Sequence, residues 1–142
     1  MNVMVLYQND QKNVKNLVSM NEITKDKNLV LSQKEILMLI ENKNSTLKDI
    51  GRVEIGKSII DDLVYAFYDS DYIDSDNYFD TINELVNIFY MYQDKFSDYL
   101  TDEEIIEYLR NNFDEMGSSL ELLGSVSFDK LNTRIIYGEC DE

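Results

Sequence analysis

Apolar residues recur at helical spacing along most of the chain, and the clearest run lies between Asp74 and Phe96. Their i, i+3, i+4, i+7 pattern lines one face of an α-helix. The members of this stripe are Tyr78, Phe79, Ile82, Leu85, Val86, Phe89, Tyr90 and Phe96. So wide an apolar face predicts a central helix surrounded by other elements, with Ser75 or Asp76 capping its start.

Two capping boxes mark the starts of further helices. In each, a hydroxyl accepts a bond from a backbone N–H, and a glutamate three residues later accepts one in return. The first box runs from Ser32 to Glu35 and the second from Thr101 to Glu104. They predict a helix over about 32–43 and a helix from Thr101 that ends near Gly117. Leu47 and Ile50 suggest a further short turn or helix before Gly51.

Other segments carry weaker patterns. Apolar spacing predicts a helix from Gly56 to Tyr68 and a short one over 120–123, capped by Ser118 or Ser119 and ended by Gly124. Residues 8–28 are polar and weakly patterned, so we expect a loop there with one helical turn around 14–20.

The two ends of the chain have β-strand composition, at residues 3–7 and 133–137. They predict either a small β pairing of the termini or an arm and an extended tail. The whole pattern predicts an all-α fold, a compact bundle of four to six helices. With 142 residues the chain fits one domain, which we divide into an N-terminal arm (1–30), a helical core (31–124) and a C-terminal tail (125–142).

The charge of the chain is strongly negative and unevenly distributed. The formal net charge is −15; residues 1–50 hold 7 basic and 6 acidic side chains, and residues 51–142 hold 6 basic and 22 acidic ones. Direct binding to nucleic acid needs a basic footprint, so we expect none. The acidic surface either keeps the protein soluble or meets a basic protein partner.

Targeting and cysteine signals favour the cytoplasm. There is no run of 18 apolar residues that could span a membrane, and the N-terminus lacks the basic start of a signal peptide. Cys140 is the one cysteine and fits a reducing compartment.

The sequence offers no catalytic residue. Without histidine, nucleophile–histidine pairs and histidine-ligated metals are excluded. No nucleophile with an orienting base is evident either. We therefore predict a protein that is not an enzyme and has no cofactor.

One motif points to phosphate binding. Gly51, Gly56, Lys57 and Ser58 satisfy the P-loop pattern G-x-x-x-x-G-K-[ST], whose backbone amides and lysine hold phosphates. Residues 45–50 lack the buried strand that should precede such a loop, and Glu54 adds a negative charge inside it. Nucleotide binding is therefore kept only as an alternative.

An acidic stretch lies between two predicted helices. Clustered carboxylates attract hard cations, so a weak metal site is an alternative to a simple turn, although the glycine and the final glutamate of an EF-hand are missing. The carboxylates in question belong to Asp69, Asp71, Asp74 and Asp76.

Two segments together resemble a known family. They are Gly51–Gly56 (GRVEIG) and Phe67–Ile73 (FYDSDYI), the latter with Asn77 and Tyr78. The chain resembles a group of small Firmicute, largely clostridial, proteins catalogued as a domain of unknown function. The resemblance implies coverage of about 31–124. It also implies small residues after Gly56 where this chain has Lys57 and Ser58, which would make the P-loop match accidental.

Three function hypotheses follow. The first is a non-catalytic cytoplasmic interaction or regulatory module with an acidic surface and a protein partner. The second is an acidic nucleic-acid mimic that blocks a basic partner. The third is nucleotide binding through Gly51–Ser58. We expect Arg52 to form a structural ion pair with Glu54, Asp61 or Asp62.

Overall fold

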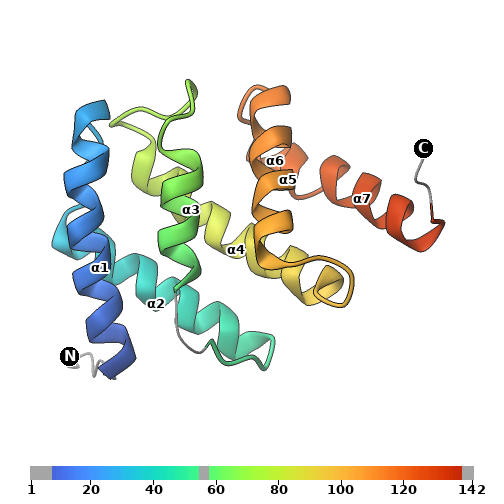
Figure 1. Ribbon diagram of the computed structural model, residues 1–142, viewed down its shortest axis with the longest axis horizontal. Coiled ribbons are helices and arrows are strands. Elements are labelled where there is room, and N and C mark those ends of the chain that lie inside the picture. The colour runs from blue at the N-terminus through green and yellow to red at the C-terminus, as the bar shows by residue number, and fades with distance from the viewer. Residues whose placement is uncertain (1–7, 55–57, 139–142) are drawn as a thin grey trace. The chain divides into compact units, whose positions relative to one another are not determined.

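The structure is helical throughout its described part. This computed structural model describes residues 8–54 and 58–138, and no strand occurs among them. Its elements are α1 (Gln8–Thr24), the 3-10 turn η1 (Lys25–Lys27), α2 (Gln33–Asp49), α3 (Ile59–Phe67), α4 (Tyr78–Phe96), α5 (Asp102–Glu115), α6 (Leu120–Leu123) and α7 (Val126–Ile136) (Figure 1). The predicted all-α fold is confirmed. In the described ranges, six helices have nine residues or more, and α6 has four.

The chain forms two compact units. The first is Met1–Asn87 and the second is Ile88–Glu142, so the division falls within α4. The prediction of one domain with an arm, a core and a tail stays a prediction.

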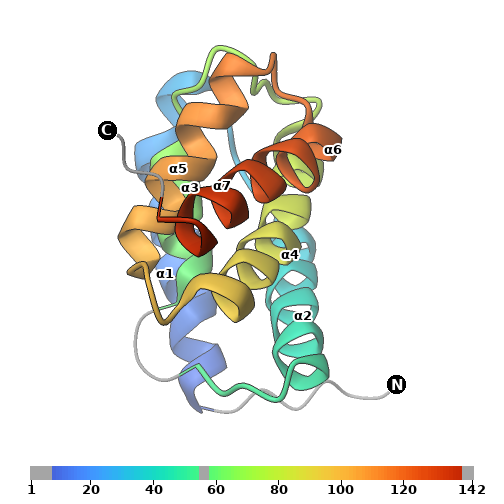
Figure 2. The same cartoon turned by 90° about the vertical axis from the view of Figure 1, so that its right-hand side faces the viewer.

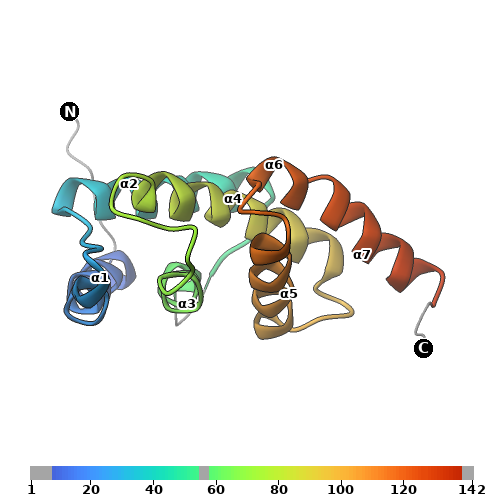
Figure 3. The ribbon, with the colours of Figure 1, turned by 90° about the horizontal axis from the view of Figure 1, so that it is seen from above.

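The first unit packs α1 against both α2 and α3. Figure 3 shows α1 and α3 side by side and nearly end-on, both on the same side of α2. The buried face of α2 is apolar at helical spacing and includes Ile36, Leu39, Ile40 and Leu47. On another face of α2, the Asn42 amide donates to the backbone carbonyl of Asn83 in α4 at 3.0 Å. Helix α2 is thus packed on α1 and hydrogen-bonded to α4.

Helix α1 corrects the prediction of a loop over residues 8–28. This helix runs for 17 residues. Its buried side is partly polar, so the spacing of apolar residues alone does not predict it. That side carries Asp10, Asn13 and Thr24 beside Leu17, all at helical spacing and all at most 6% exposed. Thr24 meets its hydrogen-bonding needs locally, since its hydroxyl donates to the carbonyl of Leu29 at 2.6 Å.

The predicted starts of α2 and α5 are confirmed, whereas α2 continues to Asp49, beyond its predicted end near residue 43. Both capping boxes form, with Ser32 before α2 and Thr101 before α5. Gly117, at φ +64°, follows α5 as expected. The central helix differs from prediction, because α4 begins at Tyr78, two residues after the predicted cap Asp76.

An aromatic cluster fills the second unit. Tyr92 meets Phe128 of α7 edge to face, with ring centroids 5.2 Å apart, and Phe96 lies 5.1 Å from the same ring. The buried Tyr92 hydroxyl donates to the backbone carbonyl of Leu123 at 2.6 Å. Edge-to-face pairs add to simple area burial. The ring contacts and the Tyr92 hydrogen bond connect α4, α6 and α7 in the second unit. Figure 2 shows the ribbons of α6 and α7 with the C-terminal part of α4.

Helix α7 corrects the prediction of a strand or an extended segment over 133–137. Residues 126–136 are helical, so 133–136 do not form a strand and the suggested β pairing of the termini is wrong at its C-terminal side. Residues 3–7 lie outside the described part. In α7, packing overrides the β-branched composition of residues 133–136, since Ser127 and Leu131 are buried one helical turn apart.

Replacing Tyr92 by phenylalanine should destabilise the second unit. The change keeps the ring and leaves the carbonyl of Leu123 without its donor, so we expect a loss of about 1–2 kcal/mol in the free energy of unfolding. Urea unfolding followed by circular dichroism measures it. Tyr99→Phe is the matched control, because Tyr99 is 66% exposed and the same deletion should change little. Equal effects in the two variants would contradict the role of the buried hydroxyl.

Tyr78 should make the stability of the protein fall at alkaline pH. Burial raises the pKa of Tyr78 to about 12, with a hydrogen bond to Thr24 acting in the opposite direction. The folded state thus keeps a proton that the unfolded chain loses above about pH 10, and the stabilisation is complete below that pH. It should decline at up to about 1.4 kcal/mol per pH unit between about pH 10 and 12. Tyr78→Phe should show a shallower decline in urea unfolding over this range, and an unchanged slope would refute the assignment.

Candidate functional site

The site begins with a lysine buried on the apolar face of α2. Lys43 follows Ile36, Leu39 and Ile40 at helical spacing, and its side chain is 2% exposed. An ammonium group in such surroundings must be paired, because desolvation costs several kcal/mol per ion.

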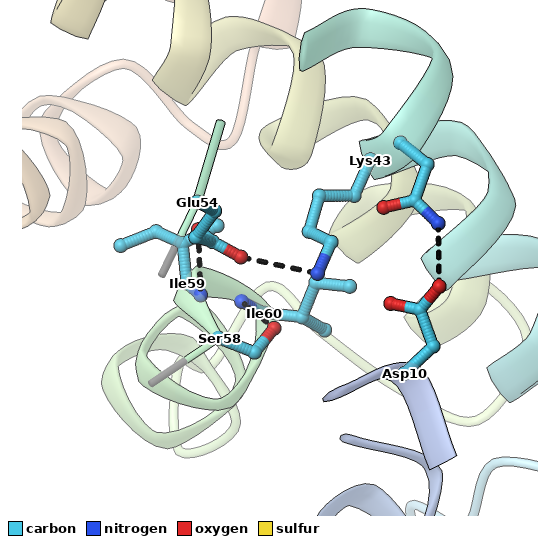
Figure 4. A network of polar contacts seen from close by, with 7 residues as sticks. Asp10, Lys43, Glu54, Ser58, Ile59 and Ile60 are labelled. Atoms are coloured by element: carbon cyan, nitrogen blue, oxygen red, sulfur yellow. Dashed lines mark hydrogen bonds and ion pairs between the residues drawn. The ribbon is translucent and has the colours of Figure 1, made fainter. Parts of the chain in front are cut away.

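The partner of Lys43 is Glu54, in the connection from α2 to α3. Its Oε1 lies 3.1 Å from Lys43 Nζ, and its Oε2 accepts a hydrogen bond from the backbone N–H of Ile59 at 3.3 Å (Figure 4). One carboxylate therefore links α2 to the first turn of α3, where the helix dipole also favours negative charge.

Ser58 completes the start of α3. Its buried side chain accepts a hydrogen bond from the N–H of Ile60 at 3.3 Å, as an N-cap residue does. The N–H groups of Ile59 and Ile60 are thus both bonded to side chains of the protein itself.

Gly51 turns the chain from α2 toward Glu54. It has φ +71°, the N–H of Gly51 bonds to the carbonyl of Lys48, and the N–H of Arg52 bonds to the carbonyl of Leu47. These two bonds form a Schellman motif, which needs a left-handed residue that glycine supplies without strain. Gly51, the first glycine of the predicted P-loop motif, thus ends α2.

A cavity opens beside the ion pair of Lys43 and Glu54, which we call the bridge. Its volume is about 520 Å³, within the range of small-ligand sites. On one side, Asp10 of α1 accepts a hydrogen bond from the Asn44 amide at 3.0 Å. The full lining consists of Asp10, Lys43, Asn44, Leu47, Lys48, Gly51, Arg52, Val53 and Glu54.

The predicted phosphate-loop residues have different places in the structure. Gly51 ends α2 and Ser58 caps α3, while Gly56 and Lys57 lie outside the described residues. The segment before Gly51 is helix, where a P-loop has a strand. Phosphate binding by these four residues stays a prediction.

The acidic stretch before α4 forms a hydrogen-bonded turn. Asp74 Oδ1 accepts bonds from the N–H groups of Asp76 and Asn77 at 2.9 and 3.0 Å. Within residues 8–54 and 58–138, no group of three or more histidine, cysteine or acidic side chains is arranged to hold a metal ion. The suggested site at Asp69, Asp71, Asp74 and Asp76 therefore has no support in this geometry.

Comparison with known proteins identifies a family. Residues 16–141 match the family of unknown function DUF6323. The chain belongs to the DUF6323 family. No curated protein and no solved structure matches it significantly. The predicted resemblance to a family of unknown function is confirmed, and the match extends beyond the expected 31–124 to include much of α1 and all of α7.

A groove lies between α5 and α7 in the second unit of this DUF6323 protein. Its volume is about 260 Å³. The guanidinium carbon of Arg134 lies 5.7 Å from the centre of the Tyr108 ring, which is cation–π geometry. Burial raises the pKa of Tyr108, and its hydroxyl donates to the carbonyl of Ser127 at 2.7 Å. The lining of this groove is Leu100, Glu104, Glu107, Tyr108, Asn111, Leu131 and Arg134.

Sequence reasoning missed Lys43. The signal was present, since the spacing of Ile36, Ile40 and Leu47 places Lys43 on the buried face, and a charged residue there implies a partner. The expected Arg52 ion pair stays a prediction; Arg52 lines the cavity together with Glu54. Among the described helices, none is both long enough and apolar enough to cross a bilayer.

Lys43→Met should destabilise the DUF6323 protein strongly. It leaves the Glu54 carboxylate without its ammonium, and breaking a buried pair in this way costs about 3 kcal/mol. Adding Glu54→Gln to Lys43→Met should restore part of the lost free energy of unfolding, because the unpaired carboxylate charge is then removed. Thermal and urea unfolding measure both variants.

The matched control is Lys48→Met, five residues further along α2 at an exposed position. We expect a change within about 0.5 kcal/mol there. If Lys43→Met and Lys48→Met are equally stable, the bridge does not organise the first unit.

Proposed function

We propose that this protein is a non-catalytic, cytoplasmic interaction module that binds a basic segment of a protein partner. The groove between α5 and α7 is the observation that carries the proposal. It combines carboxylates with an aromatic ring and apolar floor residues, which suits an arginine or lysine side chain with its long apolar stem.

The groove's own arginine supports this choice of ligand. Arg134 rests over Tyr108, so this ring already accepts a guanidinium group. Glu107 is exposed and has a carboxylate that can pair with an incoming cation. Glu104 has a structural role as well, because its Oε1 accepts a bond from the N–H of Thr101 at 2.8 Å.

The charge of the chain favours the same partner. Residues 51–142 carry 22 acidic and 6 basic side chains, so a basic segment would be attracted over a distance as well as at contact. A nucleic-acid-binding protein is one kind of basic partner. Displacement of such a partner by DNA would favour the mimic hypothesis.

Binding of a synthetic peptide that alternates arginine and leucine tests the proposal. Isothermal titration should show binding at about 50 mM salt that weakens at about 200 mM, because screening grows with ionic strength. Glu107→Lys should weaken it about tenfold by reversing a charge at the rim of the groove.

Glu41→Lys is the matched control, an equal charge reversal at an exposed position of α2. It should leave the affinity within about twofold of the wild type. Equal weakening by both reversals, or equal binding of a peptide that alternates aspartate and leucine, would refute a basic-segment site in this groove.

A further inference from the structure

The cavity of the first unit has a positive lining in a negative protein. Three of the 13 basic side chains of the chain, Lys43, Lys48 and Arg52, line it, against the carboxylates of Asp10 and Glu54. Both carboxylates are already engaged: Asp10 accepts a bond from Asn44, and Glu54 lies between Lys43 and the N–H of Ile59. The lining therefore keeps an excess of one positive charge where the whole chain carries −15.

The three cations of the lining differ in burial. Lys43 is buried and held by Glu54. Lys48 is exposed and forms no ion pair with any residue that the structure describes. Arg52, half-buried, follows the glycine turn that ends α2 and lines the same cavity as Lys48. Two cationic side chains in one cavity lining favour an anionic group there.

The remaining wall is apolar. Leu47 is buried beneath the cavity, and Val53 is 84% exposed at its edge. Covering a branched apolar side chain is favourable, and the free energy gained is proportional to the apolar area removed from water. A ligand that contacted both the cationic side chains and this apolar wall would carry an apolar body and an anionic end.

We propose that this cavity binds a small organic anion. The anionic head group, a carboxylate or phosphate, is held by Lys48 and Arg52, and its apolar body packs on Leu47 and Val53. This site is separate in residues and in chemistry from the groove proposed for a basic segment.

A nucleoside triphosphate fits less well. The backbone N–H groups of Ile59 and Ile60, at the start of α3, are bonded to Glu54 and Ser58 and so are already engaged. Several phosphate charges would face a lining with one excess positive charge. A ligand with a single anionic group matches that lining.

Titration with anilinonaphthalene sulfonate, a fluorescent probe with an apolar body and one anionic group, tests the proposal. We expect saturable fluorescence enhancement by the folded protein. Binding should weaken at least tenfold in Lys48→Gln/Arg52→Gln. Phenylnaphthylamine, a neutral relative of the probe, should bind at least tenfold more weakly than the sulfonate.

Two matched controls isolate the cavity. Lys27→Gln/Lys34→Gln removes the same charge at exposed positions of the first unit outside the lining, and should bind like the wild type. Val53→Ser should weaken the probe at least threefold, while Val30→Ser, at a position 58% exposed and outside the lining, should not. Thermal melts establish that each variant is folded. If the double variant is unfolded, Lys48→Gln alone decides, with at least threefold weaker binding expected.

Displacement of the probe identifies the head group. Benzoate and phenyl phosphate share one ring, so stronger displacement by either assigns a carboxylate or a phosphate, and benzyl alcohol should not displace. Absence of saturable binding would overturn the proposal, as would equal affinity in the cavity and control variants or equal binding of the neutral probe. None of these results depends on whether the arginine–leucine peptide binds.

Discussion

A buried ammonium group needs a fixed counter-charge, and this requirement organises the first unit. Lys43 lies on the buried side of α2, so its charge can be kept there only if a carboxylate is held beside it. Glu54 meets the need and, through its second oxygen, also bonds to the N–H of Ile59. The connection between α2 and α3 is therefore held at both of its described ends by one side chain.

The same ion pair gives the described part of the phosphate-loop motif a structural role. The motif specifies glycines, a lysine and a serine at fixed spacing, but anion binding depends on free backbone N–H groups. Here Gly51 ends a helix, and the first N–H groups of α3 bond to Glu54 and Ser58. The neighbouring cavity is lined by the side chains of Lys48 and Arg52.

The two units present opposite chemistry in a chain of one dominant charge. The cavity of the first unit gathers basic side chains, whereas the groove of the second is bordered by Glu104 and Glu107. Net charge alone describes the attraction of distant partners, and local lining decides what fits at contact. For this reason an overall charge of −15 is compatible with an anion site as well as with a site for a basic segment.

Local signals determined much of the helical fold. Apolar periodicity and capping boxes are properties of short segments, so they correctly predicted α2, α4 and α5 and the glycine that ends α5. Tertiary packing decided α1 and α7, whose buried faces include polar residues such as Asn13 and Ser127 that carry no apolar period. It also decided the site, because Lys43 and Glu54 come together only when the turn at Gly51 folds the chain back along α2. A contact between residues on separate segments depends on how those segments pack, and the spacing of residues along the chain does not contain that information.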